Sequence, residues 1–242
     1  MPPAADAIAT GGCPPLRNTA AVAALSGGTS GEAIYAMVAE AVKRRFPKGG
    51  GVVVDLGAGN GNLWLFLGSG FNRYIAIDAV RYPRLASEAE FHQADLNQRI
   101  DLSADIADLT VAVETIEHLE NPRAFMRELV RLTKPGGWVV VTTPNQLSLL
   151  SIACLTLKRR FSNFQDVHYP AHITALLEID LIRIAVECAL EEIDIQYSRS
   201  GRIPFARRHY PAALAKRFPR ALSDNLLLIG RKPQRAAGAE RE

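Results

Sequence analysis

Three alternating glycines follow directly after a run of β-branched residues, and this stretch is where the sequence first points to chemistry. Val52–Val54 and Asp55 lead into Gly57, Gly59 and Gly61, and an apolar stretch with helix-forming residues follows. β-Branched residues favour a buried parallel strand, and glycine supplies the positive φ of a tight turn. The first N–H groups of the next helix stay free to bind a ligand. The stretch therefore predicts a strand, a turn and a helix start that surround a bound cofactor.

The glycine spacing separates two classes of cofactor. A dinucleotide loop has the pattern G-x-G-x-x-G because its helix N-terminus receives a pyrophosphate. This chain instead has Asp55-x-Gly57-x-Gly59-x-Gly61, with a carboxylate two positions before the first glycine. That carboxylate suits a cationic ligand, so the spacing argues against a nicotinamide dehydrogenase, which is the alternative class of enzyme.

Two further carboxylates close expected strands. Asp78 ends a short apolar strand over 73–78, where a carboxylate can accept hydrogen bonds from both hydroxyls of a ribose. Asp95, with Leu96 beside it, ends a third strand expected over 90–96. Pro83 lies between these two strands, so we expect the intervening crossover helix to be truncated.

A second group of reactive residues follows the fourth expected strand, over 109–114. Glu114, Glu117 and His118 lie within five positions, and His168 and His172 come later. Histidine titrates near neutral pH, so His118 at the end of a strand is a candidate general base for an alcohol or phenol. Together with His168 or His172, the two carboxylates could also hold a divalent cation, and the sequence leaves this metal site open.

These motifs resemble the class I S-adenosylmethionine-dependent methyltransferases, whose first motif is an acidic residue followed by Gly-x-Gly-x-Gly. Residues 114–122, E-T-I-E-H-L-E-N-P, and residues 134–145, K-P-G-G-W-V-V-V-T-T-P-N, resemble the subgroup that contains the ubiquinone-biosynthesis O-methyltransferases. The resemblance spans about residues 52–145. It implies a Rossmann-like, doubly wound α/β fold with seven strands, mostly parallel, in which the last strand, over 225–231, runs antiparallel.

The resemblance also implies a cofactor and its site. The cofactor is S-adenosyl-L-methionine, with Asp55 holding its ammonium group, Asp78 its ribose, and Asp95 and Leu96 its adenine. The full set that the resemblance assigns to the cofactor is Asp55, Gly57, Ala58, Gly59, Gly61, Asp78, Ala79, Asp95, Leu96 and Glu114. It assigns catalysis to His118 and His172. The order Glu-x-x-Glu-His…His is similar to the metal site of small-RNA 3′-terminal 2′-O-methyltransferases.

Length and composition indicate one enzyme domain. The chain has 242 residues, of which 48% are hydrophobic and 22% charged, and its net charge is +3. We expect a disordered tail over 1–28, a methyltransferase domain over 29–232 and a second tail over 233–242. The three cysteines are scattered and the first residues lack the pattern of a secretion signal, which favours the cytoplasm. A helix over 30–46, with Ser30 as its N-cap, should precede the first strand.

Two regions of the expected domain vary most. Residues 146–170 should form a lid, whose apolar part is too short to cross a bilayer and could be a dimer face or a membrane-surface contact. Residues 198–223 form a basic insertion, which suggests an anionic acceptor. The sequence does not identify the oligomeric state.

The expected activity is transfer of a methyl group to oxygen, or alternatively nitrogen, of a small-molecule or lipid- or sugar-linked acceptor. One alternative is a metal-dependent RNA 2′-O-methyltransferase, although the chain has no recognisable RNA-binding module. Another is a non-catalytic partner subunit that binds the cofactor.

Overall fold

The sheet of this protein has seven strands in the order β3-β2-β1-β4-β5-β7-β6, as seen in a computed structural model that describes residues 19–67, 70–87, 89–206 and 208–234. The strands are β1 Val52–Leu56, β2 Arg73–Asp78, β3 Glu90–Gln93, β4 Ala107–Ala112, β5 Thr133–Pro144, β6 Glu191–Tyr197 and β7 Asn225–Arg231. β7 pairs antiparallel with both β5 and β6, whereas the pairs among β1 to β5 are parallel. The expected fold class, a doubly wound α/β sheet with an antiparallel last strand, is confirmed.

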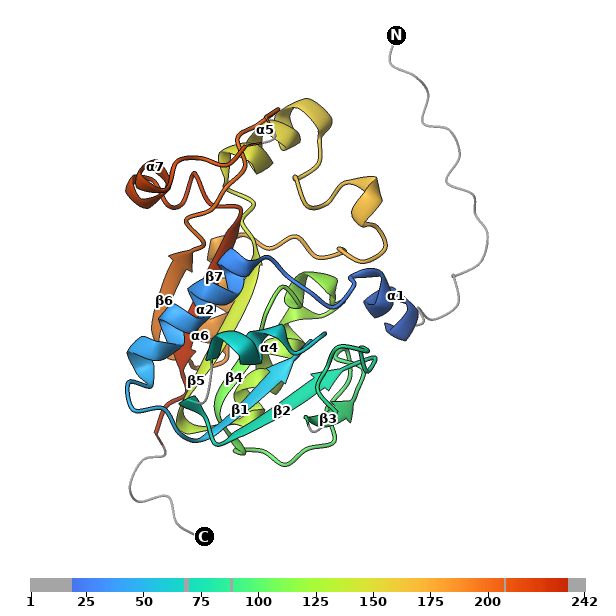
Figure 1. Cartoon of the computed structure of the whole chain (residues 1–242), viewed down its shortest axis with the longest axis vertical. Coiled ribbons are helices and arrows are strands. Elements are labelled where there is room, and N and C mark those ends of the chain that lie inside the picture. The colour runs from blue at the N-terminus through green and yellow to red at the C-terminus, as the bar shows by residue number, and fades with distance from the viewer. Residues whose placement is uncertain (1–18, 68–69, 88, 207, 235–242) are drawn as a thin grey trace.

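Helices cover both faces of this sheet (Figure 1). The α-helices are α1 Thr19–Leu25, α2 Glu32–Arg45, α3 Asn62–Leu67, α4 Pro122–Leu132, α5 Leu149–Lys158, α6 Glu178–Glu187 and α7 Ala212–Arg217. Two short 3₁₀ turns are η2 Ile116–His118 and η3 Asp166–His168. Alternate residues of each buried strand face opposite sides, so α4 and α6 pack on one face and α2 and α3 on the other.

The position of the ligand site follows from the strand order. β1 and β4 are neighbours at the centre of the sheet. The chain continues from β1 to β2 on one side and from β4 to β5 on the other side, so the connections that leave the carboxyl ends of β1 and β4 diverge. In open α/β sheets such a divergence leaves a crevice beyond the strand ends, where ligands bind. The glycine loop after β1 and the Glu-x-x-Glu-His stretch after β4 both lie at this edge.

Several local expectations are confirmed. β2 and β7 have the predicted bounds, and α4 begins at Pro122 after the N-cap Asn121, whose Oδ1 accepts a hydrogen bond from the Ala124 N–H at 3.0 Å. No helix lies between β2 and β3 in the described part of the chain, consistent with the truncated crossover. β3 is shorter than expected and ends before Asp95.

Two expectations about the N-terminal part are wrong. The helix α2 begins at Glu32 with Gly31 at its N-cap position and no side-chain cap, whereas Ser30 donates its N–H to the Tyr35 hydroxyl at 2.9 Å. Residues 19–28 do not continue a tail, because they form α1 and a turn. The rest of the expected tail, residues 1–18, lies outside the described residues, as does most of the C-terminal tail. Among the described residues, no helix combines the length and apolar character needed to cross a bilayer.

Candidate functional site

A cavity of about 560 Å³ lies at the carboxyl edge of β1, β2 and β4. Its floor includes Asp55, Gly57, Asp78 and Glu114, each of which lies within two residues of the carboxyl end of one of these strands. Eight residues of the segment 22–31 also line the cavity, as do five residues of the segment 167–172. The cavity therefore joins segments that are far apart in the sequence.

The glycine loop leaves no room for side chains. At Gly57, where φ is +82°, an added Cβ would lie 2.3 Å from Thr115 Oγ1. At Gly59, where φ is +53°, it would lie 2.3 Å from the carbonyl oxygen of Gly28. Both glycines and Ala58 line the cavity, so a ligand there can approach the bare backbone. Gly61 also has a positive φ, but it does not line this cavity and lies against the Leu85 side chain.

Asp55 offers the cavity a buried carboxylate. The Tyr74 hydroxyl donates to Asp55 Oδ2, whereas Asp55 Oδ1 is buried and has no hydrogen-bond partner among the described residues. The pKa of Asp55 is raised to about 7. Burial is the largest cause, the hydrogen bond from Tyr74 opposes it, and the charge of the nearby Asp78 adds to it. An unpartnered buried oxygen costs free energy, which a cationic donor in the cavity would offset.

Asp78 connects the end of β2 to the glycine loop. Its Oδ2 accepts the Gly59 N–H at 2.9 Å, and its Oδ1 accepts the Val80 N–H at 3.4 Å. Burial raises the pKa of Asp78, and these backbone hydrogen bonds lower it. Asp78 and its neighbour Ala79 both line the cavity, as expected for residues that contact a ribose.

The structure does not bring Asp95 into the cavity wall. Asp95 Oδ1 accepts hydrogen bonds from the N–H and the side-chain Nδ2 of Asn97, at 3.0 and 3.2 Å. Leu96 and Asn97 line the cavity instead. Leu96 therefore lines the cavity as the sequence predicts, whereas the Asp95 carboxylate bonds to Asn97 in the loop that follows β3.

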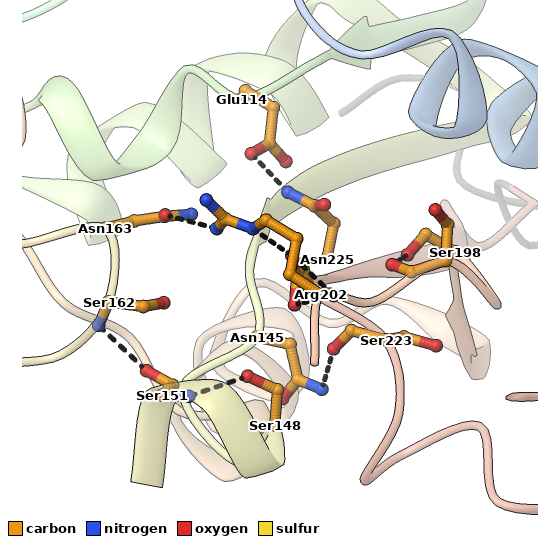
Figure 2. A network of polar contacts seen from close by, with 12 residues as sticks. Glu114, Asn145, Ser148, Ser151, Ser162, Asn163, Ser198, Arg202, Ser223 and Asn225 are labelled. Carbon is orange, nitrogen blue, oxygen red and sulfur yellow. Dashed lines mark hydrogen bonds and ion pairs between the residues drawn. The ribbon is translucent and has the colours of Figure 1, made fainter. Parts of the chain in front are cut away.

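Glu114 is held by two strands that follow it in the sequence. Thr142 of β5 donates its hydroxyl to Glu114 Oε1 at 2.9 Å, and Asn225 of β7 donates its Nδ2 to Oε2 at 2.7 Å. Figure 2 shows the Asn225 amide directed at the Glu114 carboxylate. Burial raises the pKa of Glu114 to about 7 although both hydrogen bonds lower it.

Glu117, His118 and His172 form a cluster in the wall of the cavity. Glu117 is fully buried, and its Oε1 has no hydrogen-bond partner among the described residues. His172 Nδ1 is a buried atom that likewise has no hydrogen-bond partner among them. One ligand atom from each of the three side chains lies within 4.8 Å of the others. The two histidine rings meet edge to face with centroids 4.6 Å apart, so the structure brings together the residues expected to act in catalysis.

Both histidines of this cluster favour the neutral form. Burial lowers the pKa of His118, and burial together with the neighbouring His118 and His168 lowers the pKa of His172 to about 4. His118 Nδ1 lies 3.0 Å from the carbonyl oxygen of Ala171. A carbonyl only accepts hydrogen bonds, so Nδ1 carries the proton in the neutral ring, and the backbone hydrogen bonds to Ala171 and Glu114 oppose the lowering of the pKa of His118. Burial also raises the pKa of Glu117 well above its usual value, and Glu114 adds to this shift.

Sequence reasoning missed the N-terminal wall of the cavity. Asn60 Nδ2 donates to the carbonyls of Gly27 and Gly28, both at 2.9 Å, and the Tyr82 hydroxyl bonds to Ala23 O and lies 3.2 Å from Ser26 Oγ. The adjacent glycines at 27 and 28, both with positive φ, were the only local signal of a turn in this segment. The partners lie more than 30 residues away, so no local pattern could reveal them.

The two variable regions are mostly outside the cavity. From the expected lid over 146–170, only residues 167–169 line it, and α5 does not. No described residue of the basic insertion over 198–223 lines the cavity, so the structure does not support its role in holding an anionic acceptor there. Arg207, one of its basic residues, lies outside the described residues.

The chain is similar to known methyltransferases. The profile of a family described as "Methyltransferase domain" matches residues 32–184. The mitochondrial ubiquinone biosynthesis O-methyltransferase of Mus musculus is 29% identical over 115 residues, which cover 43% of this chain and 31% of that protein. The match thus spans about a third of the relative's length.

Solved structures agree in fold. A SAM-dependent methyltransferase from Archaeoglobus fulgidus has a TM-score of 0.59 at 17% identity, covering 82% of this chain and 94% of its own. The 1,6-didemethyltoxoflavin-N1-methyltransferase of Burkholderia thailandensis, solved with S-adenosylhomocysteine, has a TM-score of 0.55 at 16% identity, covering 84% and 80%. The family profile covers more than half of the chain, including each strand that supplies the cavity floor. This chain therefore belongs to the methyltransferase domain family, the class I enzymes that use S-adenosyl-L-methionine.

Proposed function

We propose that this protein transfers a methyl group from S-adenosyl-L-methionine to a hydroxyl oxygen of a small-molecule acceptor. The observation that carries the proposal is one cavity lined both by Asp55, whose buried Oδ1 has no hydrogen-bond partner among the described residues, and by the His118–His172 pair. The name of the mouse relative, an O-methyltransferase, supports oxygen as the acceptor atom. Nitrogen of a small molecule is the alternative acceptor.

The residues present fit the cofactor. Asp55 Oδ1 would accept from its ammonium group, the backbone at Gly57 and Gly59 would pack against its methionine part, and Asp78 would contact its ribose. When bound, the cofactor supplies an electrophilic methyl group on a sulfonium. The chain's own contribution is to align the acceptor with that methyl group and to exclude water.

His118 is proposed to remove the acceptor's proton. Its Nε2 is unprotonated because Nδ1 donates to the Ala171 carbonyl, and its lowered pKa keeps the ring neutral at pH 7. A positioned base of this kind typically contributes about 10²- to 10⁴-fold to the rate. His172 packs against the ring and limits its motion.

Isothermal titration with S-adenosylhomocysteine and with NAD tests the cofactor, and a screen of phenols, catechols and sugars with trideuteromethyl-labelled cofactor tests the transfer. We expect saturable binding of S-adenosylhomocysteine only, and a product that carries the label on oxygen. Saturation by NAD alone would overturn the proposal. Cofactor binding without product from any acceptor would support a non-catalytic partner subunit instead.

A second candidate is transfer assisted by a divalent cation. Two buried ligand atoms without a partner, Glu117 Oε1 and His172 Nδ1, lie in the same cluster as His118, and such a site could bind the acceptor hydroxyl directly. This is also the arrangement expected of an RNA 2′-O-methyltransferase. Exhaustive chelation should then abolish activity and lower the melting temperature, and added Mg²⁺, Mn²⁺ or Zn²⁺ should restore both. Salt-sensitive binding of a small RNA duplex would favour the RNA acceptor.

We also propose a cytoplasmic location. The thiols of Cys154 and Cys188 are free, which suits a reducing compartment, and Cys13 lies outside the described residues.

A further inference from the structure

Helix α5 is apolar in sequence but exposed in the folded chain. Its residues are L-L-S-I-A-C-L-T-L-K, yet the buried side chain among them is the polar Ser151. The large apolar residues that it exposes are Leu149, Ile152, Leu155 and, at 67% exposure, Leu157. A single exposed leucine needs no explanation, but an apolar helix that buries only a serine does.

Polar contacts fix α5 in this orientation. Ser151 Oγ accepts the Ser162 N–H at 3.2 Å and donates to Gln146 Oε1 at 3.3 Å, so the helix turns its small polar residue inward. The Leu149 N–H donates to the carbonyl oxygen of Ala221 at 2.8 Å. Figure 2 shows Ser151, Ser148 and Ser162 within this network. The exposed apolar face therefore belongs to the folded structure.

The basic insertion extends the same surface. Arg202 Nη2 donates to Asn163 Oδ1 at 3.3 Å, which joins the insertion to the segment after α5 (Figure 2). The insertion exposes Phe205, at 79%, and also Leu214 and Phe218. Figure 1 shows α5 and α7 at the same end of the molecule. We call α5, residues 201–206 and residues 208–220 together the α5–α7 surface.

Positive charge is concentrated around this surface. Residues 147–165 contain three basic and no acidic residues, and residues 198–223 contain seven basic and no acidic residues, although the whole chain has a net charge of only +3. Lys158, Arg159 and Lys216 are exposed and make no ion pair with any described residue. Exposed apolar side chains bordered by basic ones are typical of surfaces that lie on anionic lipid headgroups.

We propose that the α5–α7 surface docks on the headgroup layer of an anionic lipid bilayer, with the apolar face of α5 lying in the interface. At ten residues, α5 is about 15 Å long, too short to cross a bilayer but sufficient to lie in its surface. A second copy of the chain fits less well, because twofold pairing through this surface would bring like charges together. Docking requires neither cofactor nor acceptor, so it is independent of the proposed function.

Vesicle flotation of the full chain tests the proposal. The probes are vesicles of phosphatidylcholine alone and of an equal mixture of phosphatidylcholine and phosphatidylglycerol. We expect flotation with the anionic mixture only, and weaker binding as salt is raised. The variant Leu155→Ser with Leu157→Ser should bind about tenfold more weakly or worse. The variant Lys158→Gln with Arg159→Gln should bind about 30-fold more weakly, because each basic residue near an anionic surface contributes about 1 kcal/mol and every 1.4 kcal/mol is tenfold in affinity.

A matched control removes exposed apolar residues elsewhere. Leu65 of α3 and Val186 of α6 are exposed at 77% and 60%, and the double variant Leu65→Ser with Val186→Ser should bind vesicles as the wild type does. Absence of flotation on the anionic vesicles would overturn the proposal, as would equal loss in the control. A dimer in sedimentation that the leucine variant converts to a monomer, without flotation, would assign the surface to a second copy. The salt series and the charge variant keep the test decisive if the leucine variant misfolds.

Discussion

At the scale of single residues, Asp55 is buried, and its Oδ1 has no hydrogen-bond partner in the part of the chain that the structure describes. A carboxylate of this kind is costly in the folded protein unless it is protonated or meets a cation. Burial raises the pKa of Asp55 to about 7, so the carboxyl titrates near neutral pH in the protein without ligand. The cationic end of the cofactor must displace the carboxyl proton.

Cofactor affinity should therefore depend on pH below neutrality. The form that binds an ammonium group is the carboxylate, so affinity should fall as the pH drops below about 7, approaching tenfold per unit. Calorimetric titration of S-adenosylhomocysteine between about pH 5.5 and 7.5 measures this slope. Asp55→Asn should bind weakly with a flat profile, and an unchanged slope in that variant would assign the titration to another group.

His118 should affect turnover and leave cofactor binding unchanged. Replacing it by alanine removes the proposed base, so kcat should fall about 10²- to 10³-fold. The affinity for S-adenosylhomocysteine should stay close to that of the wild type, because the base acts on the acceptor. His92→Ala on β3 is the control, because His92 does not line the cavity. A full kcat in His118→Ala would remove the base from the mechanism.

At the scale of elements, the turn after β1 and the segment before α2 fit together through backbone atoms alone. Gly59→Ala would place a Cβ 2.3 Å from the carbonyl of Gly28 in a backbone conformation that alanine disfavours. We expect a loss of about 1–3 kcal/mol in unfolding free energy and weaker cofactor binding, since residues 26–31 must move away. Denaturant unfolding and calorimetry measure the two effects.

Gly70→Ala is the matched control, since an added Cβ there meets no atom within 4 Å. It should change neither stability nor binding beyond a few tenths of a kcal/mol. If Gly59→Ala had as little effect as Gly70→Ala, the close approach of Gly59 to Gly28 would not contribute to stability or to cofactor binding.

The sequence predicted those elements whose signals are local. A β-branched run followed by glycines gives β1 and its turn, and Asn121 with Pro122 gives the start of α4, because strand, turn and cap preferences depend on near neighbours. Ser30 misled the prediction, since its backbone bonds to Tyr35 and Gly31 takes the cap position. The link from Asn225 to Glu114 spans 111 residues, and only the sheet order explains it.

At the scale of the whole molecule, the cavity joins residues 22–35 to the segments that follow β1, β2 and β4 and to residues 167–172, so a ligand there should stabilise the folded domain. S-adenosylhomocysteine at 100 times its Kd should add about 2.7 kcal/mol, which corresponds to roughly 5–10 °C in Tm for a chain of this size. Thermal unfolding with and without this ligand measures the shift, and NAD at the same concentration serves as the control. No shift at saturation would show that the ligand binds the unfolded chain equally well.

The hydrogen bond between Asn225 and Glu114 has a consequence for biosynthesis. The ribosome synthesises the N-terminal wall of the cavity and the glycine loop long before it translates β7, which supplies the Asn225 hydrogen bond to Glu114. A premature stop codon between positions 146 and 225 therefore leaves a polypeptide that contains the recognisable methyltransferase motifs of residues 52–145 and still lacks the Asn225 side chain that holds Glu114.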